Sequence, residues 1–190
     1  MLGKVRLNGD IALAVASSGI AALLLPGGRT AHSCFKIPIN IHEDSTCSIK
    51  HNSDLALLLQ VTKLIIWDEA PMTHRHAFEA VDRTLKDLMK AVDPSLEEKP
   101  FGGKVIVFGG DFRQILPVVI KGSREDIVGS CLRRSTLWTH IKLMTLKINM
   151  RLFRTENQPD AVEQKEFAEW LLEVGEGRIP TIRGLENNII

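Results

Sequence analysis

Lys63–Met72, with the sequence KLIIWDEAPM, is the stretch that decides the fold of this chain. Its apolar residues run directly into two adjacent carboxylates, Asp68 and Glu69. A short continuous apolar run is typical of a strand that is buried on both faces of a parallel sheet. Pro71 has no N–H to donate to a neighbouring strand, so the strand is expected to end before it. Asp68 and Glu69 are therefore expected at the carboxyl end of a buried strand, which is the edge where ligands bind in open α/β sheets.

The two carboxylates leave two interpretations open. Side by side at such an edge, Asp68 and Glu69 suit a hard cation such as Mg²⁺ with a general base beside it. The alternative is a strand that ends in a solvated acidic turn. The stretch by itself does not decide between them.

Composition narrows the class of protein. The 190 residues are enough for one domain with a substantial core. The net charge of +1 gives no sign of nucleic-acid binding, which would have to depend on a local basic patch. Cys34, Cys47 and Cys131 have spacings that form neither a disulfide framework nor a zinc pattern, so they are interpreted as core or surface thiols in a reducing compartment. No apolar run approaches the ~18–20 residues of a membrane span, and Met1–Asp10 lacks a signal-peptide core, so the protein is expected to be intracellular and not secreted.

Strand and helix patterns alternate along the chain. Besides the opening stretch, expected strands are Ile11–Ala16, Lys104–Phe108 and, from its alternating pattern, Leu143–Ile148. Expected helices cover residues 20–25, 54–60, 78–92 and 161–174, and residues 1–8 look like the end of another helix. Alternating strands and helices predict a parallel α/β sheet. A right-handed topology would gather the polar clusters that follow the strands along one edge.

Local signals refine some of these elements. Ser17 or Ser18 is expected to cap the helix at 20–25, and Thr73 the helix at 78–92. His74 and His76 lie two apart, which makes a poor metal pair, and both are interpreted as solvated. The polar segment 29–33 is interpreted, without reference to any family, as a surface loop.

Two more polar side chains follow expected strands. Gln114 lies in GGDFRQILPVV after the strand at 104–108, and Arg151 follows the strand at 143–148. Together with Asp68 and Glu69 they suit nucleoside-triphosphate hydrolysis. An acid holds Mg²⁺, a base polarises water, an amide senses the γ-phosphate and an arginine offsets the charge of the leaving phosphate.

Each of these assignments has a plainer alternative. Arg151 could be a surface arginine near a strand end, and Gln114 could cap a loop. Asp111 could accept backbone N–H groups within its own turn.

Four ordered segments resemble the motifs of the Pif-type DNA helicases (petite integration frequency helicases, superfamily 1). They are Ala14–Ser33 for motif Ia, Ile65–Met72 for motif II (the Walker B element), Phe108–Val118 for motif III and Asn149–Leu152 for motif IV. The match runs from about residue 1 to residue 180, and motif III is especially specific. The amino-acid sequences of these motifs most resemble those of the plant and helitron-transposon branch of the family.

The resemblance implies a RecA-like P-loop NTPase motor domain with a three-layer parallel sheet, using ATP and Mg²⁺. By this likeness Asp68 would hold Mg²⁺, and Glu69 would activate the attacking water. Gln114 would sense the γ-phosphate and Arg151 would contact it.

The same resemblance implies DNA as the partner. Ser18, Gly19, His32 and Ser33 match the family segment that touches single-stranded DNA, largely at its backbone and stacked bases. The family moves 5′ to 3′ along DNA and unwinds duplexes and G-quadruplexes in DNA repair, recombination and telomere maintenance. Single-stranded DNA and duplex junctions are the partners implied, no membrane is, and the expected compartment is the nucleus, with the mitochondrion as alternative.

The sequence departs from the family pattern at the phosphate loop. No G-x-x-x-x-G-K-[ST] motif is present, and the Gly3-Lys4 pair lacks both the upstream glycine and the following hydroxyl residue. The expected fold is therefore an incomplete motor domain over residues 1–184, with 185–190 as a tail, lacking the first strand and the loop that cradles phosphates. The missing strand is expected to leave an unpaired edge on the strand at 65–67 or its neighbour, or to force a re-pairing.

Three functional hypotheses follow. The first is a fragment of an ATP-dependent DNA helicase, arising from truncation or a gene-prediction error. Motifs V and VI of a second motor domain are also absent, so tight ATP binding and translocation by this chain alone are not expected. The second is a non-catalytic remnant that binds single-stranded DNA or a partner. The third is another additional-strand NTPase without unwinding activity, against which motif III and the Asn149–Arg151 segment argue.

Overall fold

The computed structural model describes residues 1–153 and 161–179 of the chain. The chain divides into two compact units, Met1–Ile141 and Lys142–Ile190. The first unit holds the sheet and the helices packed on it. The described part of the second unit holds two helices.

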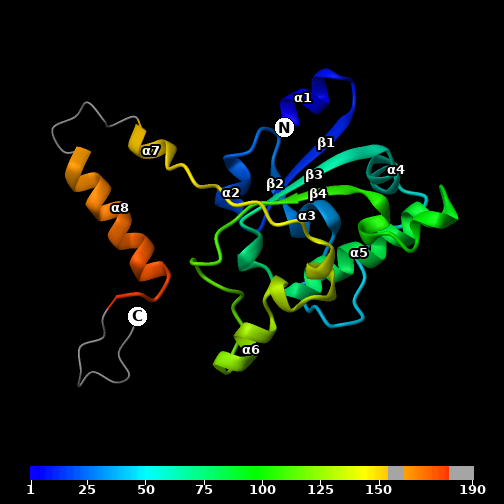
Figure 1. Cartoon of the computed structure of the whole chain (residues 1–190). Helices are drawn as coiled ribbons and strands as arrows, with labels where there is room; N and C mark the ends of the chain where they lie inside the picture. The colour runs from blue at the N-terminus through cyan, green and yellow to red at the C-terminus, as the bar shows by residue number, and fades with distance from the viewer. Residues whose placement is uncertain (154–160, 180–190) are drawn as a thin grey trace. The chain divides into compact units, whose positions relative to one another are not determined.

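The sheet of the first unit is parallel and four-stranded (Figure 1). Its strands, in the spatial order β2-β1-β3-β4, are β1 (Ile11–Ala16), β2 (Arg29–Thr30), β3 (Thr62–Asp68) and β4 (Val105–Phe108). Three of the predicted strands are thus confirmed, and the opening stretch forms β3. The predicted parallel α/β fold is confirmed as well.

β3 is an inner strand of this sheet. It pairs with β1 on one side, where Ala16 is the register partner of Asp68, and with β4 on the other, where Trp67 is the partner of Phe108. The unpaired edge expected from the sequence therefore does not fall on β3. Among the described residues the outer strands are β2 and β4, so the edge falls on the neighbour β4, where Val105 is 59% exposed.

Two strand assignments were wrong. Leu143–Ile148 forms no strand, and its side chains are exposed, because an alternating pattern forms a strand only where a neighbour supplies hydrogen bonds and a face to bury. Conversely, Arg29 and Thr30 pair with Val15 and Ala16 as β2, although residues 29–33 were expected to be a surface loop.

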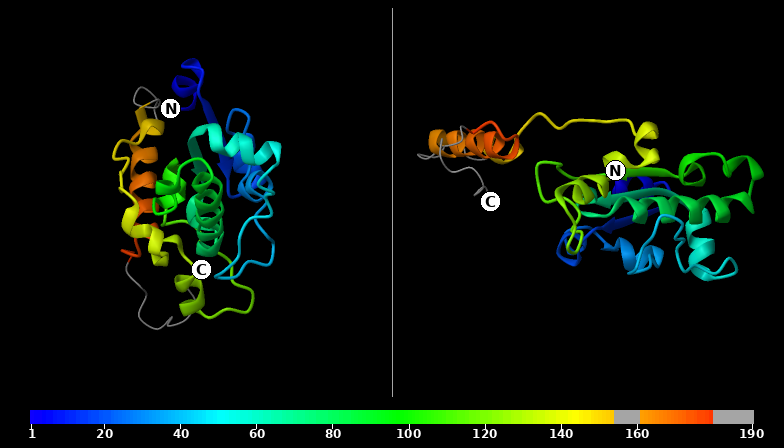
Figure 2. Two further views of the ribbon diagram at one scale, coloured as in Figure 1. Left: turned by 90° about the vertical axis from the view of Figure 1, so that its right-hand side faces the viewer. Right: turned by 90° about the horizontal axis from the view of Figure 1, so that it is seen from below.

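The predicted helices are present with small shifts at their ends, and the structure adds two that were not predicted, at Ala31–Phe35 and Met150–Phe153. They are α1 (Leu2–Leu7), α2 (Gly19–Leu23), α3 (Ala31–Phe35), α4 (Asp54–Val61), α5 (Arg75–Lys90), α6 (Arg124–Gly129), α7 (Met150–Phe153) and α8 (Ala161–Gly175). Short 3₁₀ turns lie at Ala70–Met72, Pro94–Leu96, Pro100–Gly103, Leu132–Arg134 and Thr136–His140. The long helix α5 runs alongside the sheet (Figures 1 and 2). Among the described helices, none combines the length and apolar character that crossing a membrane requires.

Helix caps account for two of the shifts. Ser18 is the N-cap of α2, and its hydroxyl accepts the Ala21 N–H at 3.2 Å, which decides between the two serines left open by the sequence. The N-cap of α5 is His74 rather than Thr73, because the His74 Nδ1 accepts the His76 N–H at 3.2 Å. The Thr73 hydroxyl instead donates a hydrogen bond to the Ser17 hydroxyl at 2.6 Å.

Trp67 is the centre of the core and joins the sheet to its helices. Its ring is fully buried, with centroids 5.6 Å from Phe35 of α3, 4.5 Å from Phe78 of α5 and 6.2 Å from Phe108 of β4. Aromatic pairs in this range add about 0.5–1.5 kcal/mol each beyond the area they bury. The residue directly before the two carboxylates is thus held from three directions.

The three cysteines are all free and buried, so of the two positions that the sequence left open, core or surface, all three occupy the core. Burial raises the pKa of the Cys47 thiol to about 11, so the thiol stays protonated at neutral pH.

In the second unit, α8 confirms the helix predicted at 161–174. Its apolar side chains Phe167 and Trp170 stack on each other at 5.8 Å between ring centroids. Residues 154–160 and 180–190 lie outside the described part of the chain.

Candidate nucleotide and DNA site at the sheet edge

Asp68 and Glu69 lie where the sequence predicts them, at the carboxyl end of β3. Both are half-buried. Asp68 Oδ1 accepts the N–H of Glu69 at 3.0 Å, which fixes the aspartate carboxylate against its own turn. Glu69 adopts a left-handed conformation with a φ of 53°, which costs about 1–2 kcal/mol in a residue other than glycine. Strain of this kind concentrates at functional sites.

Motif III begins at the end of β4, the neighbour of β3 on the side away from β1. The Gly109 N–H donates to the Trp67 carbonyl at 2.8 Å, and the Gly109 carbonyl accepts the Ala70 N–H at 2.9 Å. A Cβ on Gly109 would lie 2.8 Å from Asp68 Oδ1, and one on Gly110 would lie against the Pro71 ring. Glycines at these two positions therefore let the backbone after β4 approach the acidic turn closely.

Motif Ia lies on the opposite side, beyond β1. Ser18 and Gly19 follow the end of β1 after one intervening residue, Ser17, and Ala16 of β1 pairs with both Asp68 and Thr30. Ser18 is half-buried, and Gly19 is exposed as the first residue of α2. A Cβ on Gly19 would meet no atom within 4 Å, so its surface is open.

His32 and Ser33 lie in the first turns of α3, immediately after β2, and both are exposed. Thr30 caps this helix, because its hydroxyl accepts the Ser33 N–H at 3.3 Å. Partial burial of the ring lowers the pKa of His32, so this side chain is neutral at pH 7 and offers a hydrogen bond rather than a charge to a partner. The register thus brings all four residues of the candidate DNA segment to the same edge as the two carboxylates.

Gln114 lies in the exposed segment after β4, in the same unit as Asp68. Its N–H donates to the Asp111 carbonyl at 3.1 Å. Asp111 Oδ1 accepts the Arg113 N–H at 3.0 Å, which confirms that Asp111 accepts backbone N–H groups within its own turn.

Arg151 lies in α7 of the second unit, and its side chain is outside what the structure describes. Its proposed contact with phosphate therefore stays a prediction.

The acidic pair fits the coordination that Mg²⁺ prefers. Mg²⁺ usually binds through one or two carboxylates and completes its shell with water and substrate phosphates. Among the described residues no group of three or more His, Cys, Asp or Glu could hold a metal ion by itself. Asp68 with Glu69 beside it matches a site that needs a phosphate ligand to be complete.

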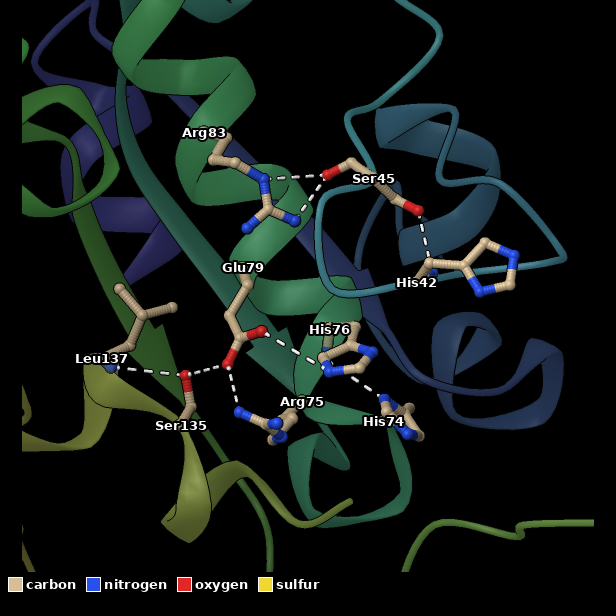
Figure 3. A network of polar contacts seen from close by, with 9 residues as sticks. All are labelled: His42, Ser45, His74, Arg75, His76, Glu79, Arg83, Ser135 and Leu137. Atoms are coloured by element: carbon tan, nitrogen blue, oxygen red, sulfur yellow. Dashed lines mark hydrogen bonds and ion pairs between the residues drawn. The ribbon is translucent and has the colours of Figure 1, made fainter. Parts of the chain in front are cut away.

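A polar network fastens the helix that follows this site (Figure 3). Glu79 of α5 is buried, and its Oε1 accepts a hydrogen bond from the Ser135 hydroxyl at 2.7 Å and pairs with Arg75 Nη1 at 3.3 Å. The Arg75 N–H also donates to the Ser130 carbonyl at 2.7 Å. These contacts hold the beginning of α5 against residues 130–137, which follow motif III in the chain.

His74 and His76 were expected to be solvated, and this was wrong. Their rings lie 4.5 Å apart in the network, and the side chain of His76 is only 17% exposed, with its Nε2 4.0 Å from Glu79 Oε2. Burial lowers the pKa of both imidazoles, and repulsion between them lowers that of His74 further. The expectation failed because helical spacing gives no information about the tertiary contacts that bury this turn, such as the approach of His76 to Glu79.

Sequence reasoning missed one residue of the site. Ser17 was considered only as one of two possible caps. The Ser17 hydroxyl accepts the Trp67 Nε1–H at 3.2 Å and the Thr73 hydroxyl at 2.6 Å. The only sequence signal for Ser17 is that two serines precede α2 while one cap is needed.

The comparisons with known proteins agree with this arrangement. Residues 1–184 match the family described as PIF1-like helicase. The chain is 28% identical over 178 residues to the ATP-dependent DNA helicase RRM3 of Saccharomyces cerevisiae, which covers 92% of this chain and 23% of RRM3. It is 35% identical over 109 residues to the ATP-dependent DNA helicase Pif1 of a Psychrobacter species, covering 56% of this chain and 16% of that protein.

A crystal structure of Bacteroides Pif1 bound to single-stranded DNA superimposes with a TM-score of 0.69 and 25% identity. That match covers 94% of this chain and 39% of the Bacteroides chain. The chain thus spans less than half the length of each of these three relatives. The family match extends over nearly the whole sequence and includes every motif at the sheet edge, so the chain belongs to the PIF1-like helicase family.

Proposed function

We propose that this chain forms part of the motor domain of an ATP-dependent DNA helicase and supplies the catalytic carboxylates and a single-stranded DNA contact. The observation that carries the proposal is the register of β1, which pairs Ala16 with Asp68 on one side and with Thr30 on the other. Through that register β2, β1 and β3 end at the same edge of the sheet, so Ser18–Gly19 and His32–Ser33 follow strands that end at the edge of the acidic turn.

In the proposed chemistry Asp68 holds Mg²⁺ and Glu69 orients and polarises the attacking water. Gln114 senses the γ-phosphate, and Arg151 offsets the charge that develops as the phosphate leaves. ATP is the nucleotide by analogy with RRM3 and the Psychrobacter Pif1, which are named ATP-dependent DNA helicases. When bound, Mg²⁺ would neutralise charge on the phosphates.

The DNA contact is proposed at Ser18, Gly19, His32 and Ser33. Gly19 and α3 present an exposed surface with hydroxyl and imidazole groups, which suits a phosphate backbone and unpaired bases without sequence readout. Single-stranded DNA is the proposed partner by analogy with the Bacteroides Pif1 that was crystallised with it. Roles in DNA repair, recombination and telomere maintenance, in the nucleus or the mitochondrion, belong to the same proposal.

The proposal is tested by the binding of fluorescent oligonucleotides to the purified chain. Anisotropy should show binding of an oligo-dT strand that is stronger than binding of a blunt duplex and weakens as salt rises, because phosphate contacts release counterions. Equal affinity for single strand and duplex, or no binding at all, would remove the DNA part of the proposal.

A further inference from the structure

The Ser17 hydroxyl is the meeting point of three segments of the site. It accepts hydrogen bonds from the indole N–H of Trp67 at 3.2 Å and from the Thr73 hydroxyl at 2.6 Å. The Ser17 hydroxyl in turn donates to the Asp68 carbonyl oxygen at 3.4 Å, and the Ser17 backbone N–H donates to the same oxygen at 3.1 Å. A hydroxyl has one donor and two acceptor positions, so all of them are used here.

These bonds act on the two carboxylates through one peptide group. The carbonyl of Asp68 and the N–H of Glu69 belong to the same planar peptide unit. Ser17 holds the carbonyl end of that unit, and the N–H end donates to Asp68 Oδ1 at 3.0 Å. The orientation of the unit therefore sets both the Asp68 carboxylate and the left-handed backbone of Glu69, whose φ is 53°.

Ser17 is also joined to the candidate DNA contact. It lies directly before Ser18, the N-cap of α2, and Gly19, the exposed first residue of that helix. Because Ser17 is joined covalently to Ser18, a ligand that displaces the start of α2 also displaces the backbone of Ser17. That displacement changes the lengths of the hydrogen bonds from Ser17 to the Asp68 carbonyl, to Trp67 and to Thr73.

We infer that Ser17 is a positioning residue that couples the occupancy of the Ser18–Gly19 surface to the geometry of the Asp68 and Glu69 carboxylates. The inference rests on the proposed function, because it needs a DNA strand at one end and a metal ion at the other. Ser17 touches neither ligand and acts through the Asp68–Glu69 peptide and the Thr73 hydroxyl. Coupling between the two ligands is reciprocal, so each must change the affinity of the other by the same factor.

Trp67 offers a reporter inside the network. The chain has three tryptophans, and replacing Trp138 and Trp170 by phenylalanine leaves Trp67 as the single emitter. Mn²⁺ serves as the probe for the carboxylates, because it substitutes for Mg²⁺ at oxygen ligands and quenches a neighbouring indole. The dissociation constant of Mn²⁺ is measured by quenching with and without a saturating oligo-dT strand, and circular dichroism confirms that each variant is folded.

The expected result is that the oligonucleotide changes the Mn²⁺ dissociation constant by a factor of about five or more, a typical coupling between two sites. In Ser17→Ala this factor should fall to about one. Thr73→Val, which removes the hydroxyl at nearly constant shape, should reduce the factor as well, whereas Ser17→Thr and Thr73→Ser, which keep a hydroxyl, should preserve most of it. A purely structural role would lower stability in these variants without separating the hydroxyl-keeping pair from the hydroxyl-removing pair.

Two outcomes separate this inference from the function beneath it. The role of Ser17 is overturned, and the proposed site is not, if the unsubstituted chain binds both ligands but Ser17→Ala and Thr73→Val keep the full coupling factor. The same conclusion follows if the unsubstituted chain binds both ligands with a coupling factor of one. If oligo-dT fails to bind, or if Asp68→Asn leaves Mn²⁺ quenching unchanged, the proposed function itself fails. Should Ser17→Ala not fold, the Thr73 pair still decides the question.

Discussion

Gly109 lies directly against Asp68, close enough that a Cβ on the glycine would come within 2.8 Å of the Asp68 Oδ1. Real Cβ atoms essentially never approach another heavy atom that closely. The end of β4 and the acidic turn after β3 therefore fit together only because residue 109 has no side chain. This close fit joins motif III to Asp68 in addition to the two backbone hydrogen bonds that Gly109 makes with Trp67 and Ala70.

Gly109→Ala should consequently disturb the carboxylate. The added methyl group forces either Asp68 or the strand end to move, and overpacking of this kind costs about 1–3 kcal/mol. Urea denaturation should show the lower stability, and Mn²⁺ quenching of Trp67 should show weaker binding. Gly129→Ala is the matched control: this residue ends α6, a Cβ there meets nothing within 4 Å, and stability should stay the same or rise by up to ~1 kcal/mol. Equal behaviour of the two variants would show that the contact does not matter.

Gly19→Ala should separate DNA binding from folding. A Cβ at this position meets no protein atom, and alanine is tolerated better than glycine in a helix, so the stability of the chain should not fall. The methyl group would instead occupy the surface where a DNA backbone is proposed to lie. We predict weaker oligo-dT binding by anisotropy at unchanged thermal stability. Wild-type affinity in this variant would mean that the strand does not approach Gly19.

The hydroxyl of Ser135 should contribute measurably to stability. It donates to Glu79 Oε1 at 2.7 Å in a buried environment, and removing it leaves a buried carboxylate short of a partner. Ser135→Ala should lower the free energy of unfolding by about 1–3 kcal/mol. Thr139→Ala, which removes an exposed hydroxyl from the same segment, should change it by less than ~0.5 kcal/mol. A similar loss in both variants would count against the network around Glu79.

The two histidines of that network should make stability depend on pH. Their folded-state pKa values lie below the 6.5 of a free histidine, chiefly because of burial. Below pH 6.5 the unfolded chain therefore binds more protons at these sites than the folded chain does, and stability falls as pH falls until the folded pKa values are passed. His76→Gln should flatten this part of the profile in urea denaturation, while His140→Gln, at an exposed site, should not. An identical profile for His76→Gln would contradict the assignment.

Several elements could be predicted from the sequence because short-range physics determines them. The short apolar runs within 11–16 and 62–68 have the length and composition of buried strands. The apolar residues of α5 recur with helical spacing and lie on one face of that helix. Because carboxyl ends of parallel strands share an edge, the sequence predicts that Asp68 and the polar residues after the strand at 11–16 lie at one edge, as they do.

Other features depend on partners that the local sequence does not reveal. β2 has two residues, too few to show any periodicity, whereas 143–148 has the periodicity of a strand and forms none. Glu79 pairs with Ser135 across 56 positions of the chain, and Ser17 pairs with Thr73 across another 56. Such pairings arise from tertiary packing, which overrides local preference.

The central claim is that Asp68 and Glu69 are the hydrolytic carboxylates of a nucleotide site, and one measurement tests it most directly. The chain is joined to the phosphate-loop segment of a relative, and ATP hydrolysis is measured with oligo-dT present for the parent, for Glu69→Gln and for the exposed control Glu98→Gln. Loss of a general base lowers turnover by about 10²–10⁴-fold, so Glu69→Gln should be nearly inactive while oligo-dT affinity and the Glu98→Gln turnover stay at the parent level. Turnover in Glu69→Gln equal to that of the parent would contradict the claim.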